Sequence, residues 1–193
     1  MSDVRIVSVD QAPWADVEQV FGTRGDPSTC WCQFFKMTGA EFAKASRELC
    51  RPLLEHQVAT LTPPPGVIAY LDDEPVGWCA VEPRPHYQRV IGSVHVEKAG
   101  ALPLDDEAIW AVTCFVVRVG FRRRGIGGAL LAGAVDAARS QGARQIEGYP
   151  TDTGGDRKSA ADLYHGTVTL FTNAGFRLIA ETAPHRALVR LDL

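Results

Sequence analysis

Three consecutive arginines, followed at once by closely spaced glycines, form the part of this chain best suited to binding an anion. Arg122, Arg123 and Arg124 are followed by Gly125 and Gly127. Arginine side chains offer fixed cationic donors that suit a pyrophosphate or a ribose phosphate. Glycine lets the backbone approach such a ligand closely, because no Cβ stands in the way. A basic turn at the start of a helix would explain any one of these features, but their combination predicts a phosphate-binding loop.

The residues on either side of this loop predict the elements that position it. Residues 112–117 are apolar and β-branched, which is typical of a buried strand. After the glycines, apolar residues recur at helical spacing at Leu130, Leu131, Ala134, Val135 and Ala138. The glycines therefore lie at a strand-to-helix turn. The unpaired N–H groups of the first helical turn carry a partial positive charge there and favour an anion.

The spacing of the glycines excludes two common phosphate loops. The dinucleotide pattern G-x-G-x-x-G needs a glycine three residues after Gly127, where this chain has Leu130, and no G-x-x-x-x-G-K-[S/T] pattern is present. The pattern R-x-x-G-x-G at Arg122, Gly125 and Gly127 resembles the acetyl-CoA pyrophosphate loop of the GNAT superfamily of N-acetyltransferases. The resemblance extends into the following helix through residues 128–130.

The resemblance implies an α/β fold with a mixed, mostly antiparallel central sheet, splayed middle strands and helices on both faces. The two splayed strands would be residues 111–117 and 143–149, which leave a V-shaped slot for the pantetheine arm. A single GNAT domain over residues 1–193 is expected. Its parts are an N-terminal strand with acceptor-side helices in 1–65, the central sheet with the acetyl-CoA site in 66–150, and a C-terminal helix with strands in 151–193.

Length and composition agree with one such domain. The chain has 193 residues, of which 46% are hydrophobic, enough to bury a sizeable core. Its 20 basic and 23 acidic residues give a net charge of −3, and no long basic block occurs outside the three arginines, so a nucleic-acid partner is not expected. The sequence has no signal-peptide pattern and no run of 18 apolar residues. These features predict a soluble cytoplasmic protein without a membrane partner.

Periodicity and turn residues predict the remaining elements. A helix over residues 40–57 has Phe42, Leu49, Leu53 and Leu54 as core positions, and Pro52 should kink or divide it. Another helix over 167–174 should end at Gly175 in a left-handed cap. The other expected elements are a helix over 13–21 and strands over 4–9, 67–71, 76–81, 176–181 and 187–191, with a hairpin turn at 72–75.

The resemblance also implies which residues bind acetyl-CoA, the acetyl donor. Backbone groups of Phe115 and Val117 would bond the pantetheine amides, with Val116 between them. The backbone amides of residues 123–128 would surround the pyrophosphate. The implied cofactor-binding set is Phe115, Val116, Val117, Arg122, Arg123, Arg124, Gly125, Ile126, Gly127 and Gly128.

One residue departs from the family pattern. Where the family places a tyrosine that reprotonates the leaving CoA thiolate, this chain has Phe171, which has no proton to give. Tyr164 lies seven residues earlier and could fold back to supply a hydroxyl, with His165 and Cys114 as alternatives. A packing role for Tyr164 is an equal alternative. The thiolate can also take its proton from water or from the amine, so activity does not require a replacement.

A carboxylate is the natural base for an ammonium acceptor. Glu147 is the first choice, and strand alternation places Tyr149 on the same face. Tyr149 aligns best with the position where related enzymes carry a catalytic glutamate. Glu107 and Glu82 are alternatives, although each such residue is more often a solvated or salt-bridged group. Together these carboxylates would attract a cationic amine.

The segment between the first two helices is rich in aromatic residues and cysteines. The resemblance makes it part of the acceptor wall, so Trp31 and Phe34, together with Glu82, are expected to bind substrate, while simple core packing is an alternative. Cys30 and Cys32 form a C-x-C pair that suggests a zinc or redox site. No C-x-x-C element accompanies it, so no metal is expected.

The function that these features predict is acetyl-CoA-dependent N-acetyl transfer, made directly to a primary amine of a small molecule or peptide. A covalent variant through Cys114 is weighed against simple packing of that thiol. Two other classes remain as alternatives: a non-catalytic acyl-CoA-binding regulatory module, suggested by Phe171, and a cysteine-based metal or redox regulator, suggested by Cys30 and Cys32. The resemblance is compatible with a homodimer, for which the sequence shows no interface signature.

Overall fold

A computed structural model describes residues 4–93, 96, 103–154 and 163–193. Over these residues the chain forms a seven-stranded sheet in the order β1-β2-β3-β4-β5-β7-β6. Neighbouring strands are antiparallel except for β4 and β5, which are parallel. The strands are β1 (Val4–Ser8), β2 (Gly66–Leu71), β3 (Glu74–Pro83), β4 (Ile109–Val117), β5 (Gln145–Gly148), β6 (Arg177–Ala183) and β7 (Arg186–Asp192).

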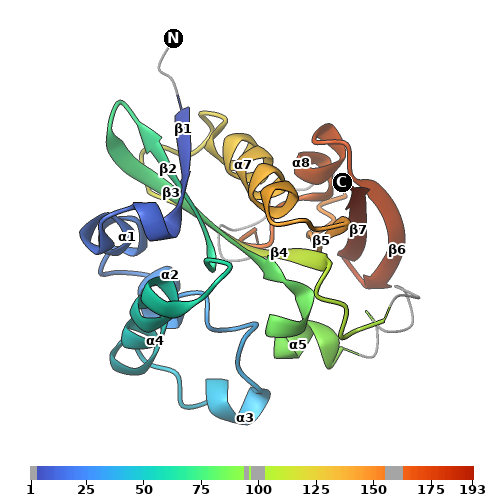
Figure 1. Cartoon of the computed structure of the whole chain (residues 1–193), viewed down its shortest axis with the longest axis horizontal. Helices are drawn as coiled ribbons and strands as arrows, with labels where there is room; N and C mark the ends of the chain where they lie inside the picture. Colours follow the sequence, from blue (N-terminus) through green and yellow to red (C-terminus); the bar gives the residue numbers. More distant parts are fainter. Residues whose placement is uncertain (1–3, 94–95, 97–102, 155–162) are drawn as a thin grey trace.

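Helices cover both faces of this sheet (Figure 1), and the predicted fold class is confirmed. The longest helix, α7 (Ile126–Ser140), packs on one face over β1 to β4, together with α8 (Val168–Asn173). The opposite face is covered by α1 (Trp14–Phe21), α2 (Pro27–Cys30), α4 (Arg47–Thr60), η2 (Arg84–His86) and α5 (Gln88–Ile91). A short η1 (Val9–Gln11) follows β1. No helix in the described part of the chain is long and apolar enough to cross a membrane.

The β2–β3 hairpin shows how local sequence fixes strand pairing. Leu71 pairs with Glu74, so Asp72 and Asp73 alone form the turn. Both have positive φ, 50° and 61°. A two-residue turn of this hand matches the twist of the flanking strands, and aspartate tolerates the left-handed conformation. The predicted hairpin is therefore confirmed, with a tighter turn than residues 72–75.

The centre of the sheet opens between β4 and β5. Their parallel pairing runs from Ile109 with Gln145 to Val112 with Gly148, where it ends. On its other side, β4 pairs with β3 through an irregularity that leaves Thr113 between the pairs made by Val112 and Cys114. β5 is shorter at both ends than the predicted strand over 143–149, and its pairing with β4 ends at Gly148. The gap between the parted strands is named here the β4–β5 gap.

The predicted helix over 40–57 is wrong in one respect. Two helices are present, α3 (Gly39–Phe42) and α4, and they divide before Ser46 rather than at Pro52. The Ser46 hydroxyl accepts a hydrogen bond from the Leu49 amide at 3.3 Å, so it caps α4 and fixes where that helix begins. Pro52 lies inside α4 without dividing it. Leu49, predicted to lie in the core, is 41% exposed.

Glycines inside two elements allow close packing around the central strands. A Cβ on Gly133 of α7 would lie 2.3 Å from Cγ2 of Ile6, so only glycine lets α7 sit this close to β1. A Cβ on Gly148 would lie 2.3 Å from the ring of Phe171. Phe171 is fully buried in the core between Phe115 and Phe176. These contacts fix α7 against the edge strand β1, and α8 against β5, which borders the β4–β5 gap.

Candidate active site

The phosphate-binding loop predicted from the sequence has the geometry for an anion. Gly125 is the residue before α7 and has a φ of +78°. The first α-helical bond joins the Ala129 amide to the Gly125 carbonyl, which leaves the amides of residues 126–128 without a partner inside the helix. A Cβ on Gly125 or on Gly128 would meet nothing within 4 Å. The space in front of these amides is open, so the residues present fit a pyrophosphate.

The three arginines lie exposed around this open space. Nε of Arg122 donates to the Val117 carbonyl at 3.2 Å, which ties the loop to the end of β4. Arg124 lies over the ring of Phe121, with 5.5 Å from its guanidinium carbon to the ring centroid. No carboxylate within the described ranges pairs with these three arginines, so their charges are available to a ligand in front of α7.

The backbone of β4 faces the β4–β5 gap at alternate residues. The Arg118 amide donates to Val76 on the β3 side at 3.0 Å. Strand alternation then points the backbone groups of Val117 and Phe115 toward the gap, as the pantetheine expectation requires. The Phe115 amide does not stand free, however, because it donates to the carbonyl oxygen of Tyr164 at 2.7 Å.

The segment over residues 163–167, named here the slot segment, bridges the two parted strands. Its Gly166 carbonyl accepts a hydrogen bond from the Thr151 amide at 3.0 Å, while the Gly166 amide donates to Leu163 at 2.9 Å. Its Tyr164 carbonyl holds Phe115 on the other side of the gap. The chain itself therefore occupies the place beside Phe115 where a pantetheine amide is expected.

The side chains of the slot segment pack toward the acceptor side. The Tyr164 ring lies 6.4 Å from that of Phe34 and 3.9 Å from the imidazole of His165. Burial raises the pKa of Tyr164. Burial also lowers the pKa of His165 to about 3, with a smaller effect in the same direction from the charge of Arg186. Tyr164 thus keeps its proton, and His165 is neutral at physiological pH.

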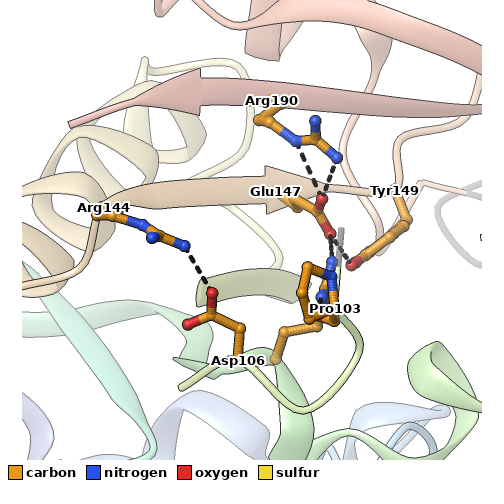
Figure 2. A network of polar contacts seen from close by, with 7 residues as sticks. Pro103, Asp106, Arg144, Glu147, Tyr149 and Arg190 are labelled. Carbon is orange, nitrogen blue, oxygen red and sulfur yellow. Dashed lines mark hydrogen bonds and ion pairs between the residues drawn. The ribbon is translucent and has the colours of Figure 1, made fainter. Parts of the chain in front are cut away.

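Glu147, the first choice for a base, lies at the centre of a buried charge network (Figure 2). Its Oε1 accepts from Nε and Nη2 of Arg190 at 3.1 and 2.7 Å. Its Oε2 accepts from Nη1 of Arg84 at 3.1 Å and from the Tyr149 hydroxyl at 2.9 Å. A carboxylate has about four lone-pair positions, and four donors fill them here. The expected meeting of Glu147 and Tyr149 is present, but little accepting capacity remains for a substrate proton.

The two arginines of this network were not identified from the sequence. Arg84 is fully buried, donates through Nη2 to the Pro103 carbonyl and lies 63 residues from Glu147 in the chain. Arg190 sits in an otherwise apolar stretch of β7 and pairs in register with Glu147. A cation inside an apolar strand is costly unless paired, and that was the available signal. Asp106 and Arg144 form a separate pair nearby at 2.6 Å (Figure 2).

Glu82 is the second buried carboxylate, and it shares a row of the sheet with Glu147. Glu82 is in register with Ala111, and Ala111 is in register with Glu147. Its Oε1 pairs with the ammonium of Lys36, and its Oε2 lies 3.1 Å from Nδ1 of His86. The hydrogen bond to Glu82 raises the pKa of His86 despite partial burial. Glu107, the other alternative base, is largely exposed and lies 3.6 Å from Nε2 of His86.

Three buried polar atoms near the end of the β4–β5 gap have no hydrogen-bond partner among the described residues. They are the Tyr87 hydroxyl, Oγ1 of Thr113 and Nδ1 of His165. Burial raises the pKa of Tyr87 well above its usual value, the charge of Glu82 raises it further, and the nearby Thr113 hydroxyl opposes both. Buried polar atoms are nearly always paired. This group is therefore placed to accept a ligand or water.

The predicted substrate-binding aromatic residues occupy two different environments. Trp31 is fully buried and stacks on Phe21 with 4.7 Å between ring centroids, while its Nε1 donates to Ser28 at 2.8 Å. These contacts are those of a core residue. Phe34 is partly exposed beside Tyr164, with the guanidinium of Arg89 4.3 Å from its ring centroid. Phe34 therefore lies at the border of the slot segment.

The cysteines show the chemistry of buried thiols. All five are free. Burial raises the pKa of Cys30 to about 12, with a further contribution from Cys32, and burial raises the pKa of Cys32 and Cys79 well above the usual value. Such thiols stay protonated and are poor nucleophiles. Within the described ranges, no group of three His, Cys, Asp or Glu residues is arranged to hold a metal ion.

A pocket of about 500 Å³ opens between α3 and α4 on the same side of the sheet as Glu82, and is named here the α3–α4 pocket. It combines polar and apolar lining groups. They include Gln33, Lys36, Met37, Leu49, Leu53 and Gln57. A second pocket of similar volume lies between β1, β2 and α7, away from the β4–β5 gap.

Comparison with protein families defines the class of this protein. The model of the acetyltransferase (GNAT) family matches residues 31–166, which include the phosphate-binding loop, the β4–β5 gap and Glu82. The chain belongs to this family, and its activity class is acetyl-CoA-dependent acetyl transfer. The resemblance predicted from the R-x-x-G-x-G loop is therefore confirmed. No curated protein matches the chain.

Solved structures show the same fold at low sequence identity. A GCN5-related N-acetyltransferase from Kribbella flavida is 18% identical, with a TM-score of 0.56 and coverage of 98% of each chain. The GNAT domain of PAT from S. lividans is 16% identical, with a TM-score of 0.57, 100% of this chain covered and 90% of that one. A Bacillus subtilis acetyltransferase in complex with CoA is 16% identical, with a TM-score of 0.52 and 99% coverage of both.

Proposed function

We propose that this protein transfers the acetyl group of acetyl-CoA directly to a primary amine of a small molecule or peptide. The observation that carries the proposal is the open phosphate-binding loop at Gly125–Gly128, placed at one end of β4 while buried carboxylates and unpartnered polar atoms lie at the other. Acetyl-CoA would supply the acetyl group as an activated thioester. The residues of the chain bind acetyl-CoA, orient the two substrates and take the proton from the acceptor ammonium.

Binding of acetyl-CoA is assigned to the loop and to β4. The free amides of residues 126–128 and the exposed Arg122, Arg123 and Arg124 suit the phosphates. The gap-facing backbone of Phe115 and Val117 suits the pantetheine amides, once the Tyr164 carbonyl has released the Phe115 amide. Gly125, Gly127 and Gly128 leave the loop backbone open to close approach by the phosphates.

The acid–base roles divide between two carboxylates. Glu147 is assigned to positioning, because its four bonds to Arg84, Arg190 and Tyr149 fix β5 and β7 at the closed end of the gap. Glu82 is assigned as the group that receives the acceptor's proton, since it already holds an ammonium ion. Tyr164 remains a proton donor for the thiolate, and solvent is the alternative source.

The first experiment combines acetyl-CoA titration calorimetry with a thiol-release assay over a panel of primary amines. Gly128→Leu is the informative variant. Its Cβ meets nothing within 4 Å, so the variant should fold, and we expect its side chain to obstruct the open space beside the amides proposed to bind phosphate. We expect acetyl-CoA affinity to fall at least about tenfold, since a displaced charge-assisted phosphate contact costs that much or more.

Gly39→Leu is the matched control, because a Cβ there also meets nothing and the residue begins the exposed helix α3. It should bind acetyl-CoA as the unaltered protein does. Equal affinity of Gly128→Leu and the unaltered protein would overturn the proposed loop. Tight binding without thiol release from any amine would favour a regulatory acyl-CoA-binding module, the alternative suggested by Phe171 and by the occupied Phe115 amide.

A further inference from the structure

The ammonium group of Lys36 is held by three groups that together form an ammonium-binding site. It pairs with Oε1 of Glu82, donates to Oε1 of Gln57 at 3.1 Å and lies 5.9 Å from the ring centroid of Tyr87. The Lys36 side chain is 11% exposed and that of Glu82 is 0% exposed. A carboxylate, an amide oxygen and an aromatic face are the groups with which proteins bind a cationic amine. Lys36 therefore fills a site that is complete for an ammonium ion.

This site lies at the closed end of the β4–β5 gap. Glu82 is in register with Ala111, one residue before Val112, the last residue of β4 that pairs with β5. The phosphate-binding loop follows the opposite end of β4, so a ligand that lies along β4 from that loop ends near Thr113. Tyr87, whose ring faces Lys36, also lies close to the Thr113 hydroxyl. The ammonium site and the end of the proposed acetyl-CoA path therefore adjoin.

The α3–α4 pocket gives this site its own entrance. Lys36 and Gln57 line the pocket and also form the ammonium site. Met37, Leu49 and Leu53 supply apolar surface along the same pocket. Glu41 and Lys44 add charged groups to the lining, and a ligand with an alkyl stem and a terminal ammonium suits this mixture of apolar and polar groups. Glu82 is fully buried and pairs with Lys36, so a ligand in the pocket reaches Glu82 only when the Lys36 ammonium moves away.

We propose that the acceptor is an unbranched primary alkylamine, and that its ammonium takes the place of the Lys36 ammonium on Glu82 after entry through the α3–α4 pocket. Lys36 is then the chain's own occupant of the acceptor site. The aminoalkyl group is shared by diamines and by lysine side chains, and the assay below separates these two sources. This inference rests on the proposed acetyltransferase function and names its substrate class.

The same site disfavours α-amino acids. The carboxylate of an α-amino acid is two bonds from its amino nitrogen, so pairing that nitrogen with Glu82 would bring two carboxylates together in a buried place. Like charges in a site of low polarity repel strongly. An aminoalkyl group carries no such charge near its nitrogen. The charge at Glu82 therefore selects for the alkylamine.

The transfer step is balanced with the groups present. Glu82 takes one proton from the alkylammonium, and the neutral nitrogen attacks the thioester carbonyl carbon. The N–C bond forms, the C–S bond breaks, and the thiolate leaves and takes a proton from Tyr164 or water. As the amide forms, the nitrogen loses its second proton to water or to the Tyr164 oxygen, which restores the proton donor. Glu82 gives its proton to solvent and regains its charge, so one proton is released in each turnover. Because the amide is uncharged, it no longer pairs with Glu82, and the Lys36 ammonium can return.

The test uses thiol release from acetyl-CoA with 1,5-diaminopentane, Nα-acetyl-lysine amide and glutamate as acceptors. Lys36→Met keeps the length of the side chain and removes the competing ammonium. We expect the KM for 1,5-diaminopentane to fall at least about fivefold, because the binding-competent fraction of the protein rises. Glu82→Gln should raise that KM at least about tenfold, since a charged partner is lost. Arg24→Met, which removes an exposed cation in the same half of the chain, should leave the KM unchanged.

Lys36→Met removes the ammonium from the buried Glu82 and leaves His86 as its one remaining partner among the described residues, so a second measurement on the unaltered protein accompanies it. The ¹³Cε resonance of Lys36 should shift saturably as 1,5-diaminopentane is added, because the ammonium leaves Glu82. A Lys36 resonance that does not move at saturating diamine would overturn the proposal. So would a higher KM for Lys36→Met, or glutamate as the best acceptor.

These outcomes separate the inference from the function on which it rests. If amines release thiol but the Lys36 resonance does not shift, the proposed acetyltransferase activity is supported and the proposed ammonium site is wrong. Failure of every amine to release thiol sinks the proposed function itself. Faster release with the diamine than with the lysine amide identifies a free alkylamine as the acceptor, and the reverse order identifies a lysine side chain.

Discussion

Glu147 receives four hydrogen bonds from Arg84, Arg190 and Tyr149 inside the core. Buried ion pairs of this kind contribute little net stability. Removing one partner is nevertheless destabilising, because the remaining partner is left as an uncompensated charge in the core. Glu82 differs because its cationic partner Lys36 comes from a segment beside a pocket rather than from a neighbouring strand. Mutation of Glu147 is therefore expected to lower stability, and mutation of Glu82 is expected to weaken binding of the acceptor.

Glu147→Gln should lower the free energy of unfolding by about 3–5 kcal/mol, because Arg84 and Arg190 lose their shared carboxylate. Tyr149→Phe is the control, since it removes a single hydrogen bond and should cost about 1 kcal/mol. Urea unfolding at neutral pH measures both. If Glu147→Gln folds with unaltered stability but loses acetyl transfer, Glu147 acts on the substrate and not on the fold.

His165 makes stability depend on pH. Its folded-state pKa is lowered to about 3 by burial and by Arg186, below the unfolded value of about 6.5. The unfolded state therefore binds a proton first as pH falls, so this contribution to stability is complete above about pH 6.5 and decreases from there toward pH 3. The loss approaches about 1.4 kcal/mol per pH unit from this group.

The check compares urea unfolding at pH 7 and pH 4.5 for His165→Gln and for His185→Gln. His185 is exposed between β6 and β7, so its variant should keep the steep pH dependence of the unaltered protein. His165→Gln should flatten it, because the replaced group no longer titrates. Equal slopes for all three proteins would contradict the buried, neutral imidazole.

The slot segment is the element on which access to β4 depends. It joins the Phe115 amide on one side of the β4–β5 gap to the Thr151 amide on the other through two of its carbonyls. These bonds replace the strand pairing that ends at Val112 and Gly148. An arriving pantetheine amide competes for the Phe115 amide, so the proposed function requires the segment to move.

Hydrogen–deuterium exchange tests this movement. On addition of acetyl-CoA, we expect the Thr151 amide to exchange faster, because the Gly166 carbonyl that accepts from it moves away. The Phe115 amide should stay protected, since a ligand carbonyl replaces that of Tyr164. Amides of β1, which is separated from β4 by β2 and β3 in the sheet, provide the internal reference. An unchanged Thr151 amide at saturating acetyl-CoA would show that the slot segment stays in place.

The elements that sequence predicts well are those set by neighbouring residues. The turn before α7 follows from Gly125 and Gly127, and the β2–β3 hairpin from its two aspartates, because each conformation depends on a few adjacent residues. The division between α3 and α4 was missed, although Ser46 carries a capping signal. The Ser46 cap starts a new helix there, although the apolar spacing predicts one continuous helix.

The polar interior could not be predicted in the same way. Glu147 bonds to Arg84 and Arg190 across 63 and 43 residues of chain, so those partners meet only when the strand order is known. The bond between Phe115 and Tyr164 likewise depends on how a later segment enters the sheet. The sequence identifies the acids and bases, but the assignment of Glu147 to structure and Glu82 to the acceptor depends on tertiary contacts.

At the scale of the whole molecule, the net charge disfavours binding of the acetyl-CoA phosphates, and only the arginines near α7 favour it. The net charge is −3, so the distant field repels a polyanion, while the exposed Arg122, Arg123 and Arg124 attract it near α7. Attraction between exposed charges is screened when the Debye length shrinks to a few Å. The affinity for acetyl-CoA should therefore depend on these three residues and on salt together.

Titration calorimetry from 50 to 500 mM NaCl tests this dependence. We expect the Kd for acetyl-CoA to rise about tenfold over that range, because screening weakens the exposed contacts while the backbone amides of residues 126–128 keep theirs. The double variant Arg123→Gln/Arg124→Gln should bind more weakly at low salt and show a shallower salt dependence. Arg24→Gln, which removes one exposed cation elsewhere, should keep the full dependence. A Kd for acetyl-CoA that does not change with salt concentration would mean that the arginines do not contact the ligand and that the helix N-terminus alone binds the phosphates.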